Sequence, residues 1–239
     1  MKMFFLLGLL ILAPYLAFAS DIAQQQSTLY PFRTTIELQD EFTSGSTGNG
    51  TTGNLGFGTA NGTTTGQASV ANRIGIIRRD TSAVSGTIAV IFLNSTTSTA
   101  INPANVHRVV WVDRLNTNDA NTTVRIGSIN SVTVSPPAEG IFLEKLDADT
   151  NWFCVTRAAG VQTRTDSTIA VTTNFAIFSY TANSSGVQFS IDNVNVCGLQ
   201  TTNIPTVFIN PATQIVNSAA ASKTIDMDYF QLQIFGLGR

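Results

Sequence analysis

Two carboxylates near the end of the chain have a spacing that could do chemistry. Asp226-x-Asp228 places them at alternate positions, so in a β-strand they share one face. Glycosidases use two carboxylates about 5 to 10 Å apart. The geometry permits catalysis, but solvated carboxylates on a strand are far more common. We therefore expect Asp226 and Asp228 to serve structure, as calcium ligands or as hydrogen-bond partners of a neighbouring strand.

A second acidic run resembles part of a calcium loop. Asp147-x-Asp149-x-Asn151 supplies oxygen ligands at the first, third and fifth positions of the pattern. The pattern also needs glycine and glutamate at positions where this chain has Trp152 and Ala158. A turn between two strands explains the run more simply. Calcium is the one cofactor that the sequence suggests.

Other catalytic and metal chemistry lacks its partner residues. His107 is the sole histidine, without a Gly-x-Ser-x-Gly elbow or H-x-x-x-H spacing, so we expect a structural histidine at a strand edge. The only two cysteines, Cys154 and Cys197, have no neighbours at zinc-binding spacing. They can pair as a disulfide in an oxidising compartment, or they can be two buried thiols. The sequence leaves both alternatives open.

Aromatic side chains offer a different chemistry, because their rings stack on sugar rings while neighbouring amides and carboxylates form hydrogen bonds with the sugar hydroxyls. The candidates for a glycan site are Trp152, Trp111, Tyr180 and Tyr229. Trp152 is the first of these because it follows a polar turn. Burial in the core is the alternative for each ring, since most aromatic residues of a β-sandwich lie there.

The charge pattern excludes one class of partner. The net charge is −2, only 12% of residues are charged, and lysine and arginine are scattered. No basic stripe is present that could neutralise a phosphate backbone, so we expect no nucleic acid partner. The surface must instead consist largely of uncharged hydroxyls and amides.

The first residues predict export from the cell. A lysine, a short apolar run and an A-x-A pattern ending at Ala19 are typical of a signal peptide over residues 1–19. An uncleaved membrane anchor is the alternative. A polar lead over residues 20–33 then precedes a single domain over residues 34–239. We expect a secreted, extracellular or cell-surface protein.

The body of the chain reads as an all-β domain, because short runs with period-two alternation are separated by turn signals. The clearest run, Val109–Leu115, places Val109, Trp111 and Asp113 on the same face. Residues 43–66 read as a long loop with a short strand near Leu55, and Pro211 reads as a turn signal. Further strands are predicted over Thr34–Phe42, Asn72–Arg78, Thr87–Leu93, Thr123–Ile126, Ile141–Leu146, Trp152–Arg157, Phe175–Tyr180, Val187–Ile191 and Lys223–Phe235. In the last of them, the pattern places Ile225, Met227 and Tyr229 opposite Asp226, Asp228 and Phe230.

Five segments together carry a family resemblance. They are Trp111–Gly127, Gly140–Lys145, Asn151–Phe153, Thr163–Asp166 and Ala221–Phe230. The chain resembles, over nearly the whole of its predicted mature length, the concanavalin A-like jelly-roll domains of bacteriophage tail and fibre proteins. The resemblance implies an antiparallel two-sheet jelly-roll sandwich at a virion surface or in an extracellular setting, with glycan recognition as a frequent use.

The resemblance also implies that the strand ending Asp40-Glu41-Phe42 lies near the closing strand Asp226–Phe230. Asp40 and Glu41 would then offer a second place for calcium, beside Asp226 and Asp228. Some enzymes of this fold carry their carboxylates on one strand as E-x-D-x-x-E, and no such spacing occurs in this chain. We therefore expect a protein without enzymatic activity.

Three functions follow in order of preference. The first is a secreted or virion-exposed sandwich that binds carbohydrate or another surface polymer. The second is a structural subunit of a capsid spike, fibre or extracellular filament, whose polar lead reaches a second copy or another virion protein. The third is a polysaccharide hydrolase or lyase, which lacks its expected carboxylates.

Overall fold

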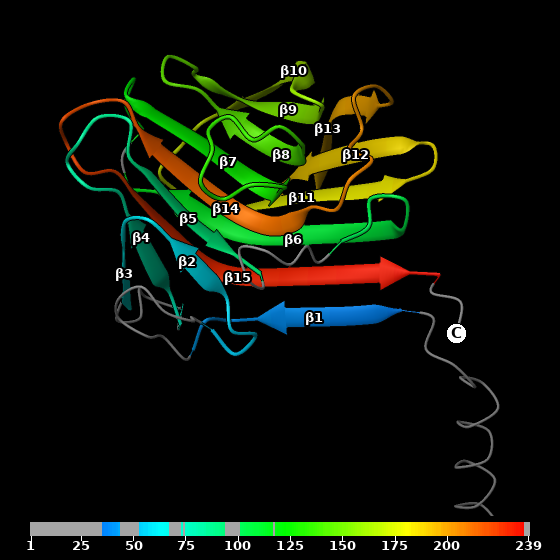
Figure 1. Cartoon of the computed structure of the whole chain (residues 1–239), viewed down its shortest axis with the longest axis horizontal. Helices are drawn as coiled ribbons and strands as arrows, with labels where there is room; N and C mark the ends of the chain where they lie inside the picture. Colours follow the sequence, from blue (N-terminus) through cyan, green and yellow to red (C-terminus); the bar gives the residue numbers. More distant parts are fainter. Residues whose placement is uncertain are drawn as a thin grey trace, which may run out of the picture. The chain divides into compact units, whose positions relative to one another are not determined.

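The computed structural model describes residues 35–43, 53–66, 73, 75–93, 101–116 and 118–236. All of their regular elements are β-strands, arranged as two antiparallel sheets (Figure 1). This confirms the predicted all-β jelly-roll sandwich. Within these residues, no helix has the length and apolar character needed to cross a membrane. The predicted signal peptide and polar lead lie outside the described residues.

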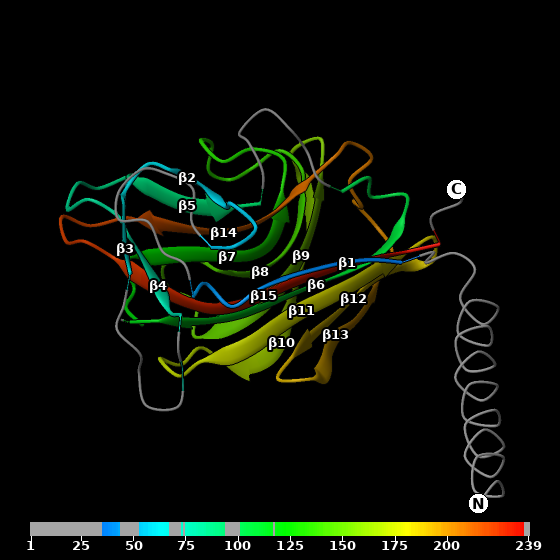
Figure 2. The ribbon, with the colours of Figure 1, turned by 90° about the horizontal axis from the view of Figure 1, so that it is seen from below.

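The two sheets contain eight and seven strands. The eight-stranded sheet has the order β13 (Val194–Gln200), β12 (Gly186–Ile191), β11 (Ala176–Asn183), β6 (Val106–Leu115), β15 (Thr224–Phe235), β4 (Ile77–Asp80) and β3 (Thr63–Gly66), and β1 (Ile36–Asp40) also pairs with β15. The seven-stranded sheet has the order β10 (Val161–Ala170), β9 (Asn151–Ala158), β8 (Gly140–Lys145), β7 (Thr122–Ile129), β14 (Asn210–Asn217), β5 (Ile88–Phe92) and β2 (Gly58–Ala60). Figure 2 shows β1, β15, β6, β11 and β12 side by side in one layer.

The core forms between the inner faces of the two sheets, and β6 lies at its centre. Val109 and Trp111 are each 1% exposed, as the predicted alternation of this strand requires. The Trp111 ring packs against Phe230 and Phe57, with ring centroids 4.6 and 5.7 Å apart. Such aromatic contacts add to the free energy gained by burying the rings.

A β-bulge in β15 changes which of its residues enter the core. The register with β6 shifts between Met227 and Tyr229, so Asp228 is an extra residue on this strand. After the bulge, Phe230 is fully buried, whereas Tyr229 is partly exposed. The predicted faces of this strand are therefore right up to Met227 and wrong beyond it, because one inserted residue inverts a period-two pattern.

The first strand lies where the resemblance implies. Asp40, the last residue of β1, pairs with Phe230 of β15. Its carboxylate accepts hydrogen bonds from the backbone N–H groups of Phe42 and Leu55, both at 2.7 Å. A Cβ at Gly53 would lie 2.5 Å from Asp40 Oδ2, and the φ of +74° there also favours glycine. Asp40 therefore orders the turn that leads to β2.

Four strands escape the sequence prediction. β3 lies within the segment predicted as a loop, and Pro211 lies inside β14 rather than in a turn. Pro211 is compatible with a central strand because pairing with β5 begins only at the next residue. β10 and β13 lack an apolar alternating pattern, since both run along an outer edge of their sheet and expose many side chains.

Candidate functional site

The aromatic residues predicted to bind a glycan lie in the core. Trp111, Trp152 and Tyr180 are 1%, 3% and 2% exposed. The Trp111 indole N–H donates to the carbonyl of Gly127 at 3.2 Å, and the Tyr180 hydroxyl donates to Ser128 Oγ at 2.7 Å. Burial raises the pKa of Tyr180. The prediction that these three residues bind a ligand is wrong, because none of their rings reaches the surface.

Asp226 and Asp228 face arginines. Asp226 is fully buried and accepts hydrogen bonds from Arg78 Nε at 2.7 Å and Arg114 Nη2 at 2.8 Å, while Asp228 pairs with Arg73. Burial alone would raise the pKa of Asp226, but the hydrogen bonds from the two arginines hold it below its usual value. Calcium does not fit here, because a cation would meet positive charge at both carboxylates. The prediction of these two residues as calcium ligands is therefore wrong.

The second acidic run is the turn between β8 and β9, the simpler of the two predicted alternatives. Asp147 accepts a hydrogen bond from the Thr123 hydroxyl at 2.9 Å. Asp149 accepts one from the Leu146 N–H at 2.7 Å and pairs with Arg164. The guanidinium again opposes a cation, so calcium ligation by this run is wrong as well. The described part of the chain contains no group of three or more His, Cys, Asp or Glu side chains suited to a metal ion.

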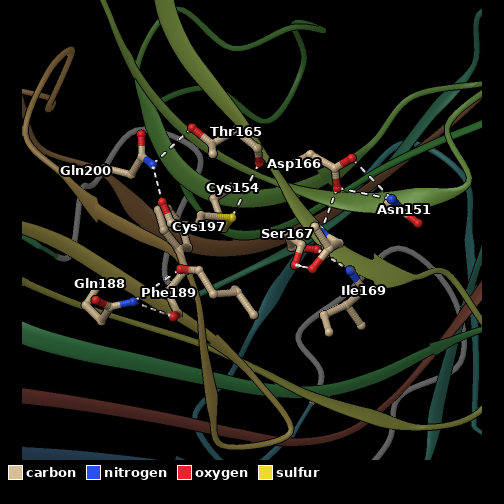
Figure 3. The surroundings of a disulfide bond; sticks show 12 residues. Asn151, Cys154, Thr165, Asp166, Ser167, Ile169, Gln188, Phe189, Cys197 and Gln200 are labelled. Atoms are coloured by element: carbon tan, nitrogen blue, oxygen red, sulfur yellow. Dashed lines mark hydrogen bonds between the residues drawn. A yellow bond between two sulfur atoms is a disulfide. The ribbon is translucent and has the colours of Figure 1, made fainter.

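Cys154 and Cys197 are joined by a disulfide between β9 and β13, with a Cα–Cα distance of 6.3 Å (Figure 3). The bond therefore connects the two sheets near their edges. Beside it, Gln200 Nε2 donates to Thr165 Oγ1 at 3.1 Å and to the Cys197 carbonyl at 3.2 Å. The structure thus contains the disulfide rather than two free thiols.

The outer face of the seven-stranded sheet carries a buried polar network. Arg125 Nε and Arg164 Nε donate to the two oxygens of Glu144 at 2.8 and 2.9 Å. Arg125 Nη1 also donates to Ser135 Oγ and to Gln214 Oε1, both at 2.8 Å. Ser135 belongs to the segment after β7, which therefore covers this part of the face. Burial lowers the pKa of Arg125, and the charge of Glu144 opposes that shift.

The same network reaches solvent on β9 and β10. Phe153 is half-buried there, and the Arg164 guanidinium carbon lies 3.5 Å from the centroid of its ring. Next to them, Asn151 Nδ2 lies 3.2 Å from each oxygen of the exposed Asp166 carboxylate. We call Asn151, Phe153, Arg164 and Asp166 the β9–β10 face. It combines an aromatic ring with planar polar groups on a rigid sheet.

The sequence contained a signal for this face. In a strand that buries Trp152 and Cys154, period-two alternation directs Asn151 and Phe153 outward. Trp152 is the first predicted ligand-binding ring because it follows a polar turn, but the alternation assigns the exposed positions to its two neighbours. Arg164 and Asp166 could not be assigned to the same surface, because β10 was not predicted as a strand.

One further titratable group lies between the sheets. Asp113 is fully buried on the inner face of β6, and Oδ2 accepts a hydrogen bond from the Thr213 hydroxyl at 2.8 Å. Burial raises the pKa of Asp113 well above its usual value. His107, also on β6, is fully buried, with Nδ1 2.7 Å from the Asn105 carbonyl. Burial lowers its pKa. Neither group reaches a surface where a substrate could bind.

The fold is that of the concanavalin A-like lectins and glucanases, since the two antiparallel sheets match solved structures of both kinds. A Bacillus licheniformis β-glucanase has a TM-score of 0.55 and 12% identity, with 82% of this chain and 97% of that one covered. The carbohydrate recognition domain of Emp47p has a TM-score of 0.55 and 10% identity, with 84% and 95% covered. A Shewanella oneidensis protein of unknown function has a TM-score of 0.59 and 12% identity, with 90% and 95% covered.

At these identities the likeness concerns the fold alone. No protein-family model matches the sequence, and no curated protein matches it either.

Proposed function

We propose that this chain is a secreted, non-enzymatic sandwich that binds an uncharged carbohydrate at the β9–β10 face. The observation that carries the proposal is the half-buried Phe153 ring with the Arg164 guanidinium stacked on it. Two hydrogen bonds from Arg164, to Glu144 and Asp149, hold the guanidinium in place. A rigid aromatic and guanidinium surface stacks on a sugar ring at little cost in conformational entropy.

The polar neighbours support a sugar ligand. Asn151 and Asp166 present an amide and a carboxylate at the surface, which can donate to and accept from adjacent sugar hydroxyls. Arginines already pair with Glu144 and Asp149, which leaves Asp166 as the exposed carboxylate of this face, and its charge disfavours an acidic sugar. The β-glucanase and the carbohydrate recognition domain of Emp47p share this fold and act on or recognise carbohydrate, as their names state.

The absence of catalysis is part of the proposal. Glu144 and Asp166 both pair directly with Phe153, from the strands on either side of it. Both oxygens of Glu144 accept hydrogen bonds from guanidiniums, so Asp166 has no second free carboxylate beside it to complete an acid and nucleophile pair. We expect a screen on common polysaccharides to show no turnover.

A glycan array with the purified chain tests the binding function. We expect binding to neutral oligosaccharides, and a loss of about tenfold or more in affinity for Phe153→Ala and for Asn151→Ala. Phe208→Ala is the matched control, because Phe208 is an aromatic residue that is 52% exposed and lies outside this face. Thermal melting verifies that each variant is folded. Equal affinities of the Phe153 variant and the native protein would refute the assignment.

A structural subunit of a virion or filament is the second candidate, favoured by one observation. β13 is an edge strand of its sheet, and its residues Val194 and Leu199 are 60% and 51% exposed. Exposed apolar residues on an edge strand favour pairing with another chain. Light scattering distinguishes the candidates: a monomer supports the binding domain, and an assembly that Val194→Lys dissolves supports the structural subunit.

A further inference from the structure

A row of alternating charges crosses the outer face of the eight-stranded sheet. Arg114 of β6 pairs with Asp226 of β15, and Asp226 pairs in turn with Arg78 of β4. Both arginines donate to the Asp226 carboxylate, through Nε and Nη2 in each case, at distances from 2.7 to 3.0 Å. Three neighbouring strands therefore place two guanidiniums around a single buried carboxylate.

The arginines of this cluster outnumber the carboxylates that they contact. Asp226 supplies one negative charge against the two positive charges of Arg78 and Arg114. The adjacent pair of Arg73 and Asp228 is neutral as a unit. Three arginine side chains that are between 24% and 36% exposed therefore share the two carboxylates that they contact, and Asp80 of β4 acts on Arg78 as a further negative charge. An isolated structural ion pair would need only one arginine for each aspartate.

Phe175 holds two of these guanidiniums in place. The guanidinium carbons of Arg73 and Arg114 lie 4.4 and 4.7 Å from the centroid of its ring. Cation–π contacts of this length restrict the rotamers of both arginines. A ligand that binds them therefore loses less side-chain entropy than it would on two mobile arginines.

Hydrogen-bond donors are also left over. Within the part of the chain that the structure describes, Nη1 of Arg78 and Nη1 of Arg114 have no acceptor. Arginine has five N–H donors in a planar fork that matches the two oxygens of a carboxylate. The cluster thus offers ordered, partly exposed donors in a group where the arginines outnumber the carboxylates that they contact.

The sheet surface next to the cluster carries further polar side chains, and the charges of Glu37, Glu41 and Arg108 act on Tyr229 there. Tyr229 follows Asp228 directly, and its hydroxyl donates to Gln39 Oε1 at 3.3 Å. Ser179 of β11 lies 3.1 Å from Ser190 of β12 through their hydroxyl oxygens. Amides and hydroxyls of this kind can form hydrogen bonds with sugar hydroxyls. A peptide ligand would instead pair its backbone with an exposed edge strand of the protein.

We propose that Arg73, Arg78, Arg114 and Phe175 form a binding site for the carboxylate of an acidic sugar such as a uronate. One carboxylate supplies a third anionic partner for the three arginines and accepts from the Nη1 groups, while the sugar hydroxyls contact the neighbouring amides and hydroxyls. The site is independent of the β9–β10 face, which belongs to the other sheet and exposes the carboxylate of Asp166.

Calorimetric titration with a galacturonate trisaccharide and with the neutral galactose trisaccharide tests the site. We expect the acidic sugar to bind at least about tenfold more tightly than the neutral one, because charge-assisted hydrogen bonds are the stronger kind. Arg73→Gln and Phe175→Ala should each weaken its binding about tenfold, since each removes part of the ordered donor set. Added salt should weaken it as well, because the site is partly exposed.

Arg157→Gln is the matched control, because Arg157 is a partly exposed arginine on the other sheet that bonds to Gln162. It should leave the affinity for galacturonate unchanged. Thermal melting identifies any variant that fails to fold, and Phe175→Leu, which keeps the bulk and removes the ring, then replaces Phe175→Ala. Equal binding of the two sugars would overturn the proposal. A glutamate-rich peptide that binds as tightly as galacturonate would overturn the assignment to a sugar.

Discussion

Removal of the Cys154–Cys197 disulfide should lower stability by an amount that follows from its position. The two cysteines are 43 positions apart, and constraining a loop of this length in the unfolded chain stabilises the fold by about 4 kcal/mol. A domain of about 200 residues has an unfolding entropy of about 0.4 kcal/mol per kelvin near its melting temperature. We therefore expect the melting temperature to fall by about 10 °C when the bond is absent.

Circular dichroism melting of the oxidised protein and of a Cys154→Ala, Cys197→Ser double variant measures this shift. Alanine suits position 154 because Cys154 is fully buried, and a hydroxyl there would lack a hydrogen-bond partner. A reducing agent should lower the melting temperature of the native protein alone, and leave the double variant unchanged. A difference below about 1 kcal/mol would refute the loop-entropy reasoning. It would mean that other contacts, such as that of Gln200 with Thr165, already hold the two edges together.

Two further predictions concern buried carboxyls. Since burial raises the pKa of Asp113, the folded state favours its neutral form, and stability falls as pH rises from the usual value of 3.8 towards the raised one. Asp113→Asn should remove that loss of stability, so the melting temperature of the variant should exceed that of the native protein near pH 7 and be close to it near pH 3. A lower melting temperature of the variant at pH 7 would contradict this. Since the pKa of Asp226 is lowered, its ionised carboxylate stabilises the fold above pH 3.8, and this stabilisation is lost as pH falls through the lowered pKa. Asp226→Asn should therefore destabilise the protein at neutral pH. Added calcium should not shift the melting temperature of the native protein, and a calcium-dependent rise would contradict the arginine-paired assignment.

The sequence predicted those parts of the fold in which local pattern and tertiary context agree. In β6 the predicted shared face of Val109, Trp111 and Asp113 matches the observed burial, because a central strand of a sandwich has one face in the core. The pairing of Asp40 with Phe230 agrees with the family resemblance. Bulges are different, since no residue type at Asp228 signals the insertion that turns Phe230 inward.

The site was harder to predict than the fold. Large aromatic side chains both fill the cores of β-proteins and stack on ligands, so their type alone does not distinguish a core ring from a ligand-binding one. Trp152 is in the core and Phe153 at the surface, although they are adjacent. The arginines near Asp226 and Asp228 come from strands distant in sequence, and only the paired sheet brings them to the carboxylates.

The pairing of β1 with β15 has a mechanical consequence. Ile36 at the start of β1 lies opposite Ile234 near the end of β15, so the chain enters and leaves this sheet at the same place (Figure 1). Tension applied across these two points would load the hydrogen bonds between the strands one pair at a time, as in opening a zipper. We expect β1 to peel away first, at low force, and the turn that Asp40 orders to loosen with it. The disulfide between Cys154 and Cys197 would limit the length to which the whole chain can be extended, because the segment between the two cysteines does not bear the load.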